Sequence, residues 1–137
     1  MNTDLFERKV YLSGNSMQMN KRDWFSSVYR KAIDYTIIKI NTPRATINEA
    51  DSFKKFLELK LKDNSFNLII DFGPCEFIDS TFIGTIVKIF NKVKSGNKNL
   101  ILVVPNKKQA SILTINKLDR LFKIFPSIEN AISFVAA

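Results

Sequence analysis

The residues best suited to carry chemistry in this sequence are Asp79, Ser80 and Thr81. The apolar residues that follow them recur at helical spacing up to about Lys94, which predicts that the three residues stand at the start of a helix. Free backbone N–H groups and the helix dipole at such a place favour a negative charge, so a serine there is well suited to phosphorylation. Taken alone, the Asp-Ser pair is more typical of a plain helix cap.

Other chemistries have little support in the sequence. The chain has no histidine, which excludes Ser-His-Asp and Cys-His catalysis and most zinc sites. Asp71 ends an apolar run and could share a sheet edge with Asp79, but residues 41–43 lack the acidic pair that a phospho-aspartate site needs to hold a metal. Cys75 is the single cysteine and is interpreted as an inert loop thiol. We therefore expect no catalytic residue, no metal, no cofactor and no enzyme activity.

Composition indicates one globular domain. The chain has 137 residues, 45% of them apolar and 12 of them Phe, which is enough to fill a core. Its net charge of +8 would suit an acidic partner, anionic lipid or nucleic acid. The lysines are dispersed and form no basic block with interleaved aromatics, which argues against nucleic acid. No apolar run is long enough for a membrane span and no signal peptide is recognisable, so a cytoplasmic protein is expected.

The hydrophobic pattern predicts alternating strands and helices. Strands are predicted over 25–30, 35–40, 66–72, 100–104 and 121–125, and helices over 47–61, 81–94, 107–115 and from 128 onward. Thr46 and Glu49 have the spacing of a capping box, and Ser127 can cap the last helix. This order predicts an α/β fold with a mostly parallel four- to five-stranded sheet, an antiparallel N-terminal strand and four helices. Residues 1–20 are predicted to be a tail or irregular extension, and 21–137 a single domain.

Two segments resemble the signature of STAS domains, the family of the bacterial anti-sigma factor antagonists. The first runs from the strand 68–72 through Glu76-Phe77-Ile78-Asp79-Ser80-Thr81-Phe82-Ile83-Gly84, and the second covers residues 118–131. Together they extend the resemblance over residues 25 to 135 in one continuous register. The resemblance implies a STAS-like fold for this chain.

The resemblance also implies a phosphorylation switch. In the family, the serine after this aspartate is phosphorylated by an anti-sigma factor that is a serine kinase, and a metal-dependent serine phosphatase reverses the modification. The unphosphorylated antagonist binds the anti-sigma factor and thereby frees the sigma factor for transcription. Carried over, Ser80 is the phosphorylation site, and Asp79, Ser80, Thr81, Phe82 and Gly84 form the partner-binding surface. The family usually has glycine at position 82, so Phe82 is expected to reshape that surface.

Two other functions remain open on the sequence. The Phe82 substitution would also suit a constitutive STAS scaffold or interaction subunit of a signalling assembly or lipid transporter, without phosphoregulation. The positive charge and the paired carboxylates would suit a small enzyme or a nucleic-acid-binding protein, although the chain has only four glycines and no glycine-rich phosphate loop.

Overall fold

The computed structural model describes residues 24–62, 64–107 and 118–137 of the chain. The strands are Phe25–Arg30 (β1), Tyr35–Ile40 (β2), Arg44–Ala45 (β3), Leu68–Asp71 (β4), Phe77–Ile78 (β5), Leu100–Val103 (β6) and Lys123–Phe125 (β7). The helices are Ile47–Leu61 (α1), Ser80–Ser95 (α2), Ile128–Ala136 (α4) and the 3-10 turn Leu118–Arg120 (η1). The predicted extension over residues 1–20, and all but the first residue of the predicted helix over 107–115, lie outside the described residues.

One five-stranded sheet forms the centre of the fold, in the order β1-β2-β4-β6-β7. Strand β1 pairs antiparallel with β2, and the other neighbouring pairs are parallel. This confirms the predicted α/β fold with its antiparallel N-terminal strand. Three of the four predicted helices lie in the described part, and the structure adds a second, two-stranded sheet of β3 and β5 that the sequence pattern did not predict.

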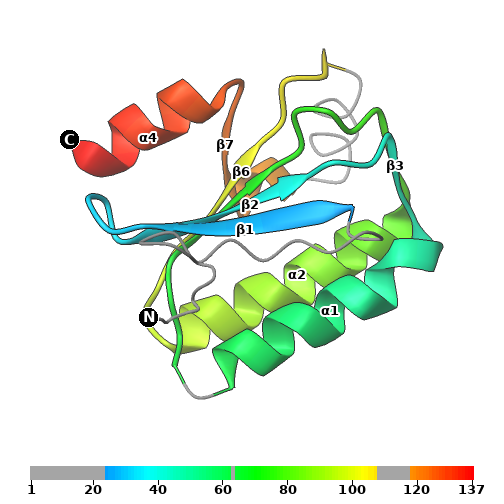
Figure 1. Cartoon of the computed structure of the whole chain (residues 1–137), viewed down its shortest axis with the longest axis horizontal. Coiled ribbons are helices and arrows are strands. Elements are labelled where there is room, and N and C mark those ends of the chain that lie inside the picture. Colours follow the sequence, from blue (N-terminus) through cyan, green and yellow to red (C-terminus); the bar gives the residue numbers. More distant parts are fainter. Residues whose placement is uncertain (1–23, 63, 108–117) are drawn as a thin grey trace.

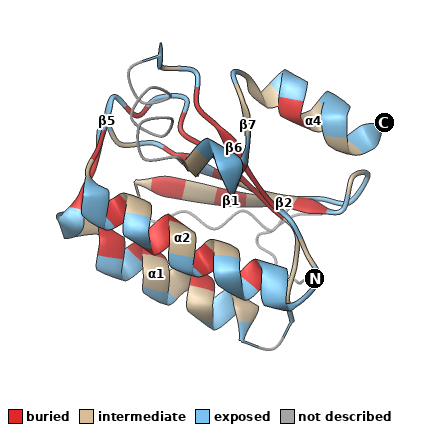
Figure 2. Ribbon diagram, turned by 180° about the vertical axis from the view of Figure 1, so that it is seen from behind, coloured by how far each residue is buried: buried red, intermediate tan, exposed pale blue. Residues whose placement is uncertain are grey.

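Helices cover both faces of the sheet, so the core has two parts (Figure 1). Helices α1 and α2 lie side by side on one face and α4 lies on the other. Successive residues of a strand point to opposite faces, so Leu68 and Ile70 of β4 pack toward α1 and α2, whereas Ile69 packs with Ala131 of α4. Figure 2 shows the buried residues concentrated between these layers. The prediction of a central strand buried on both faces is therefore confirmed.

Aromatic side chains fill the core between the sheet and the helices α1 and α2. Phe82 stacks on Phe53, with ring centroids 5.2 Å apart and an interplanar angle of 29°. Its ring also meets Trp24 and Phe72 edge-on. The side chains of Phe53 and Phe82 are both 0% exposed, so this stack is one of the buried contacts that hold α2 against α1.

The helix ends explain where α1 and α2 begin and stop. The predicted capping box is present, since the Thr46 N–H donates to Oε1 of Glu49 over 2.8 Å. Gly96 ends α2 as predicted, but its φ of −94° is not left-handed, and Asn97 takes the left-handed position with φ 61°. Glycine is required at 96 because a Cβ there would lie 2.3 Å from Cβ of Ser65. No helix of the described segments combines the length and apolar character needed to cross a bilayer.

Replacing Phe82 by alanine tests the importance of the aromatic stack. We expect the free energy of unfolding to fall by about 3–5 kcal/mol, because the change removes a fully buried ring and leaves a cavity. Urea denaturation followed by circular dichroism measures this change. Lys88→Ala, at an exposed position of the same helix, is the control and should change stability by less than about 0.5 kcal/mol. Equal effects of the two substitutions would contradict the packing described here.

Candidate functional site

The small sheet of β3 and β5 brings the starts of two helices together. Arg44 pairs with Phe77 and Ala45 with Ile78, in parallel. The next residue after each strand is the N-cap of a helix: Thr46 for α1 and Asp79 for α2. Because the two strands run side by side, the N-termini of α1 and α2 emerge next to each other at one end of the molecule (Figure 1).

A single carboxylate, that of Asp79, caps both helices. Its Oδ1 accepts a hydrogen bond of 2.9 Å from the N–H of Phe82 in α2. Its Oδ2 accepts one of 2.8 Å from the N–H of Ile47, the first residue of α1. The backbone N–H of Asp79 donates to the carbonyl of Ala45, which fixes the residue against β3. The predicted helix cap is therefore present, and it also ties together segments 32 residues apart in the sequence.

Ser80 and Thr81 begin α2 and are both exposed to solvent. The carboxylate and carbonyl of Asp79 take up the N–H groups of Phe82 and Ile83, respectively. Within the segments that the structure describes, the Ser80 hydroxyl and the N–H groups of Ser80 and Thr81 have no hydrogen-bond partner. These groups lie at the positive ends of two helix dipoles and are open to a second molecule.

Gly84 and Phe82 differ in accessibility. Gly84 is exposed, and a Cβ built there would meet no atom within 4 Å, so the helix surface one turn after Ser80 is bare. Phe82 stands two residues after Ser80, which turns its side chain about 200° around the helix and into the core. Its exposed fraction is 0%. The ring therefore belongs to the interior, so Phe82, which was predicted as part of the partner-binding surface, presents no side-chain surface to a partner in this structure.

Exposed apolar side chains border the start of α2, and sequence reasoning missed them. Ile47 is 63% exposed and Phe77 is 40% exposed. The guanidinium of Arg44 lies over the Phe77 ring, 4.4 Å from its centroid. Apolar and Arg-aromatic surface of this kind is typical of the central part of a protein interface. Two-residue strands are too short to show any periodicity, so the sequence carried no signal that Arg44 and Phe77 face each other.

Asp71 and Cys75 play separate roles from Asp79. The buried carboxylate of Asp71 accepts the N–H of Gly73 over 2.8 Å and so stabilises the loop after β4. Asp71 and Asp79 thus accept hydrogen bonds from different backbone groups. The thiol of Cys75 is buried and lies 3.3 Å from the carbonyl oxygen of Phe77. Among the described residues, no three His, Cys, Asp or Glu side chains gather into a group that could hold a metal ion.

Substitution of Asp79 tests the shared cap. Asp79→Ala should lower the free energy of unfolding by about 2–3 kcal/mol, since two helices lose a charge-assisted hydrogen bond at once. Asp79→Asn should cost about 1 kcal/mol, because one carbonyl oxygen can serve only part of the pair. Thermal or urea unfolding measures both.

Ser127→Ala is the matched control for this experiment. Ser127 caps α4 alone, by accepting the N–H of Asn130, so its loss should cost about 1 kcal/mol. If Asp79→Ala destabilises the protein no more than Ser127→Ala does, the bond from Ile47 to Asp79 contributes nothing.

Comparison with known proteins identifies the family of this fold. Residues 28–131 match the model of the STAS domain. A Thermotoga maritima protein with the provisional name anti-sigma factor antagonist is 31% identical over 106 residues, which cover 77% of this chain and 94% of the relative. A crystal structure of a Thermotoga maritima protein with the same provisional name has a TM-score of 0.67 at 25% identity, over 82% of this chain and 95% of that one.

A solved structure of lower identity shares the fold. The Bacillus cell fate determinant SpoIIAA, in its phosphorylated form, has a TM-score of 0.57 at 14% identity, over 88% of this chain and 98% of that one. SpoIIAA has also been solved as an anti-sigma factor antagonist in its unphosphorylated form, with a TM-score of 0.58 at 13% identity, over 88% of this chain and 96% of that one. From the match over residues 28–131 and the Thermotoga relative, the chain belongs to the STAS domain family and is related to the anti-sigma factor antagonists.

Proposed function

We propose that this protein is an anti-sigma factor antagonist whose partner binding is switched off by phosphorylation of Ser80. The observation that carries the proposal is the exposed Ser80 hydroxyl at the first position of α2, directly after the carboxylate that joins two helix starts. The partner is an anti-sigma factor with serine kinase activity, and the binding surface comprises Asp79, Ser80, Thr81 and the bare turn at Gly84. Binding would free the sigma factor and so regulate transcription, in the cytoplasm.

The fold can accept a phosphate at this place. The phosphate oxygens would lie at the N-terminus of α2 and beside that of α1, where the two dipoles stabilise negative charge by about 0.3–1 kcal/mol each. The first turn of α2 contains no acidic residue, so within this turn and its cap only the carboxylate of Asp79 would repel the phosphate. SpoIIAA, which shares the fold, exists in unphosphorylated and phosphorylated forms, which supports the same tolerance here.

The same phosphate would disturb a bound partner. Phosphorylation adds about 1.5 to 2 negative charges to a surface that otherwise offers a neutral hydroxyl between exposed apolar side chains such as Ile47 and Phe77. A partner that fits the hydroxyl would have to bury the dianion without a matching cation. Mispairing of a buried interface group costs about 2–5 kcal/mol, which weakens binding by tens to thousands of fold. No large change of shape is required.

The proposed cycle assigns the covalent chemistry to other proteins. The kinase partner transfers the γ-phosphoryl group of ATP to Oγ of Ser80, which loses its proton, and ADP leaves. A metal-dependent serine phosphatase then uses water to release inorganic phosphate and restore the hydroxyl. In this division of labour the chain is the substrate and the switch, and is not itself an enzyme.

A binding comparison tests the switch. Wild type and Ser80→Ala should both retain the anti-sigma factor from a lysate of the source cells, whereas Ser80→Asp should bind it at least tenfold more weakly. Calorimetry with the purified partner gives the dissociation constants. Ser52→Asp is the control, because it adds the same charge at an exposed serine within α1. Equal binding by wild type and Ser80→Asp would instead favour a constitutive scaffold.

Phosphate mapping tests which hydroxyl is modified. After incubation with the kinase partner and ATP, mass spectrometry should place one phosphate on Ser80. Thr81→Ala should leave this labelling intact, and Ser80→Ala should abolish it. Thr81 is the natural comparison because it is also exposed and lies one residue further along the helix. Label that persists in Ser80→Ala, or absence of label with every encoded candidate kinase, would contradict the assignment.

A further inference from the structure

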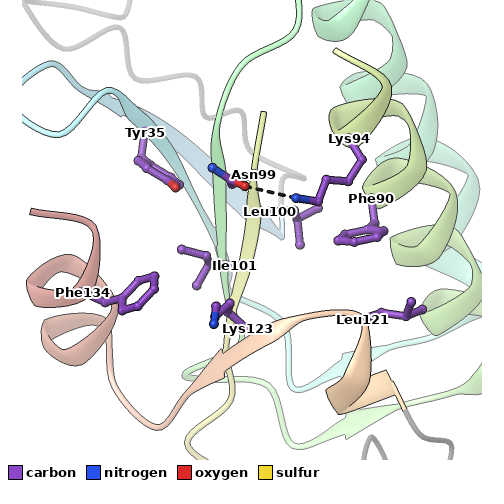
Figure 3. Close-up of a pocket in the computed structure, with 9 residues that line it drawn as sticks. All are labelled: Tyr35, Phe90, Lys94, Asn99, Leu100, Ile101, Leu121, Lys123 and Phe134. Carbon is purple, nitrogen blue, oxygen red and sulfur yellow. Dashed lines mark hydrogen bonds between the residues drawn. The ribbon is translucent and has the colours of Figure 1, made fainter. Parts of the chain in front are cut away.

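A concave site lies at the far end of α2 from Ser80. It is a hollow of about 330 Å³ beside the first residues of β2 and β6, between the last turns of α2 and the helix α4 (Figure 3). Lys94 of this hollow is 14 residues after Ser80, which corresponds to about 20 Å along the helix. The hollow is therefore separate from the proposed phosphorylation switch. Its volume falls at the lower limit of small-molecule binding sites.

Apolar side chains form much of the lining of the hollow, and two of them are about half exposed to solvent. Leu121 and Phe134 face it from opposite sides and are each 48% exposed. Phe90 from α2 and Ile101 from β6 complete the apolar lining. Large apolar side chains left half-exposed around a concavity are typical of a binding site. Such walls suit a flat or compact apolar group.

Two of the polar side chains that line the hollow, Lys94 and Lys123, are positively charged. The ammonium of Lys94 donates to Oδ1 of Asn99 over 3.3 Å. The ammonium of Lys123 lies 5.4 Å from the ring centroid of Phe134. Both lysine side chains are exposed, and no carboxylate lines the hollow among the described residues. An anion that enters the hollow would thus meet two cations without a competing acid.

Tyr35 contributes a neutral hydroxyl to the same site. Burial raises the pKa of Tyr35, and the polar contact with Asn99 opposes this rise only in part, while the charge of Asp34 adds to it. The phenol therefore stays protonated at neutral pH. The carboxylate of Asp34 is itself engaged by the hydroxyl of Tyr29 over 2.9 Å, outside the hollow. Tyr35 and Asn99 can thus offer hydrogen bonds to an anion without adding negative charge.

From this combination we infer that the hollow binds a small amphipathic anion, with an aromatic body against Phe90, Leu121 and Phe134 and one anionic group attracted by the positive charges of Lys94 and Lys123. The anionic group could be a carboxylate, sulfonate or phosphate, since all three accept hydrogen bonds from ammonium groups. The volume of about 330 Å³ limits the body to about two or three aromatic rings. Binding of this ligand does not depend on Ser80.

A matched pair of fluorescent probes tests the site. The anion 8-anilinonaphthalene-1-sulfonate and its uncharged analogue N-phenyl-1-naphthylamine share their ring system and differ in the sulfonate. Wild type should bind the sulfonate saturably at one site and more tightly than the neutral analogue. Lys94→Gln and Lys123→Gln should each weaken sulfonate binding about two- to fivefold, and together about tenfold. Neither substitution should change the affinity for the neutral probe.

Controls separate this site from general attraction to a basic protein. Lys92→Gln removes the same charge from the last turn of α2 at a residue that does not line the hollow, and should leave binding unchanged. Titration of labelled protein with the sulfonate should shift the side-chain amide resonance of Asn99 and the backbone resonances of Ile101 and Lys123. Equal affinity for the two probes, equal loss in Lys92→Gln, or no shift at Asn99 would overturn the inference.

Discussion

The carboxylate of Asp79 holds the beginnings of α1 and α2 together, and the position of Ser80 depends on this contact. Each helix start has N–H groups that cannot be satisfied within its own helix, and the half-buried carboxylate of Asp79 accepts one such group from each helix. The two-stranded sheet of β3 and β5 positions Asp79 beside the start of α1. The N–H of Asp79 donates to the carbonyl of Ala45, the last residue of β3. The exposed position of Ser80 thus depends on the capping by Asp79, and this capping depends in turn on the pairing of β3 with β5.

The period of the α-helix separates stability from recognition in α2. Ser80, Thr81 and Gly84 face solvent, whereas Phe82, Ile86 and Ile89 face the sheet and α1. Rotation of about 100° per residue allows neighbouring residues to serve these two purposes without conflict. Phosphorylation of Ser80 therefore changes only the exposed side of α2. The opposite side is held by aromatic packing, so we expect no movement of the helix.

The sequence predicted most of the central fold because its signals are long and redundant. The β-branched run of β2, the apolar run of β4 and the 3.6-residue period of α2 each involve several residues, and the caps at Thr46, Asp79 and Ser127 mark the helix starts. The capping role of Asp79 followed from its type, but its bond to Ile47 did not, because no local pattern reports a contact across 32 residues. The partner-surface role predicted for Phe82 came from the family resemblance and not from its place on the helix. Two residues after Ser80, it lies on the inner side of α2, where its ring packs with Phe53 and Trp24.

The buried ring of Phe82 also bears on how this domain can be recombined with others. The ring of Phe82 fills the volume beside Phe53 and Phe72, so these side chains are fitted to a large residue at this position. Helix α2 and its packing partners therefore form a matched set, and a helix grafted from a relative would bring either a void or a clash into the interior. Chimeras of such domains are best cut so that α1, α2 and the segment at Trp24 come from one parent.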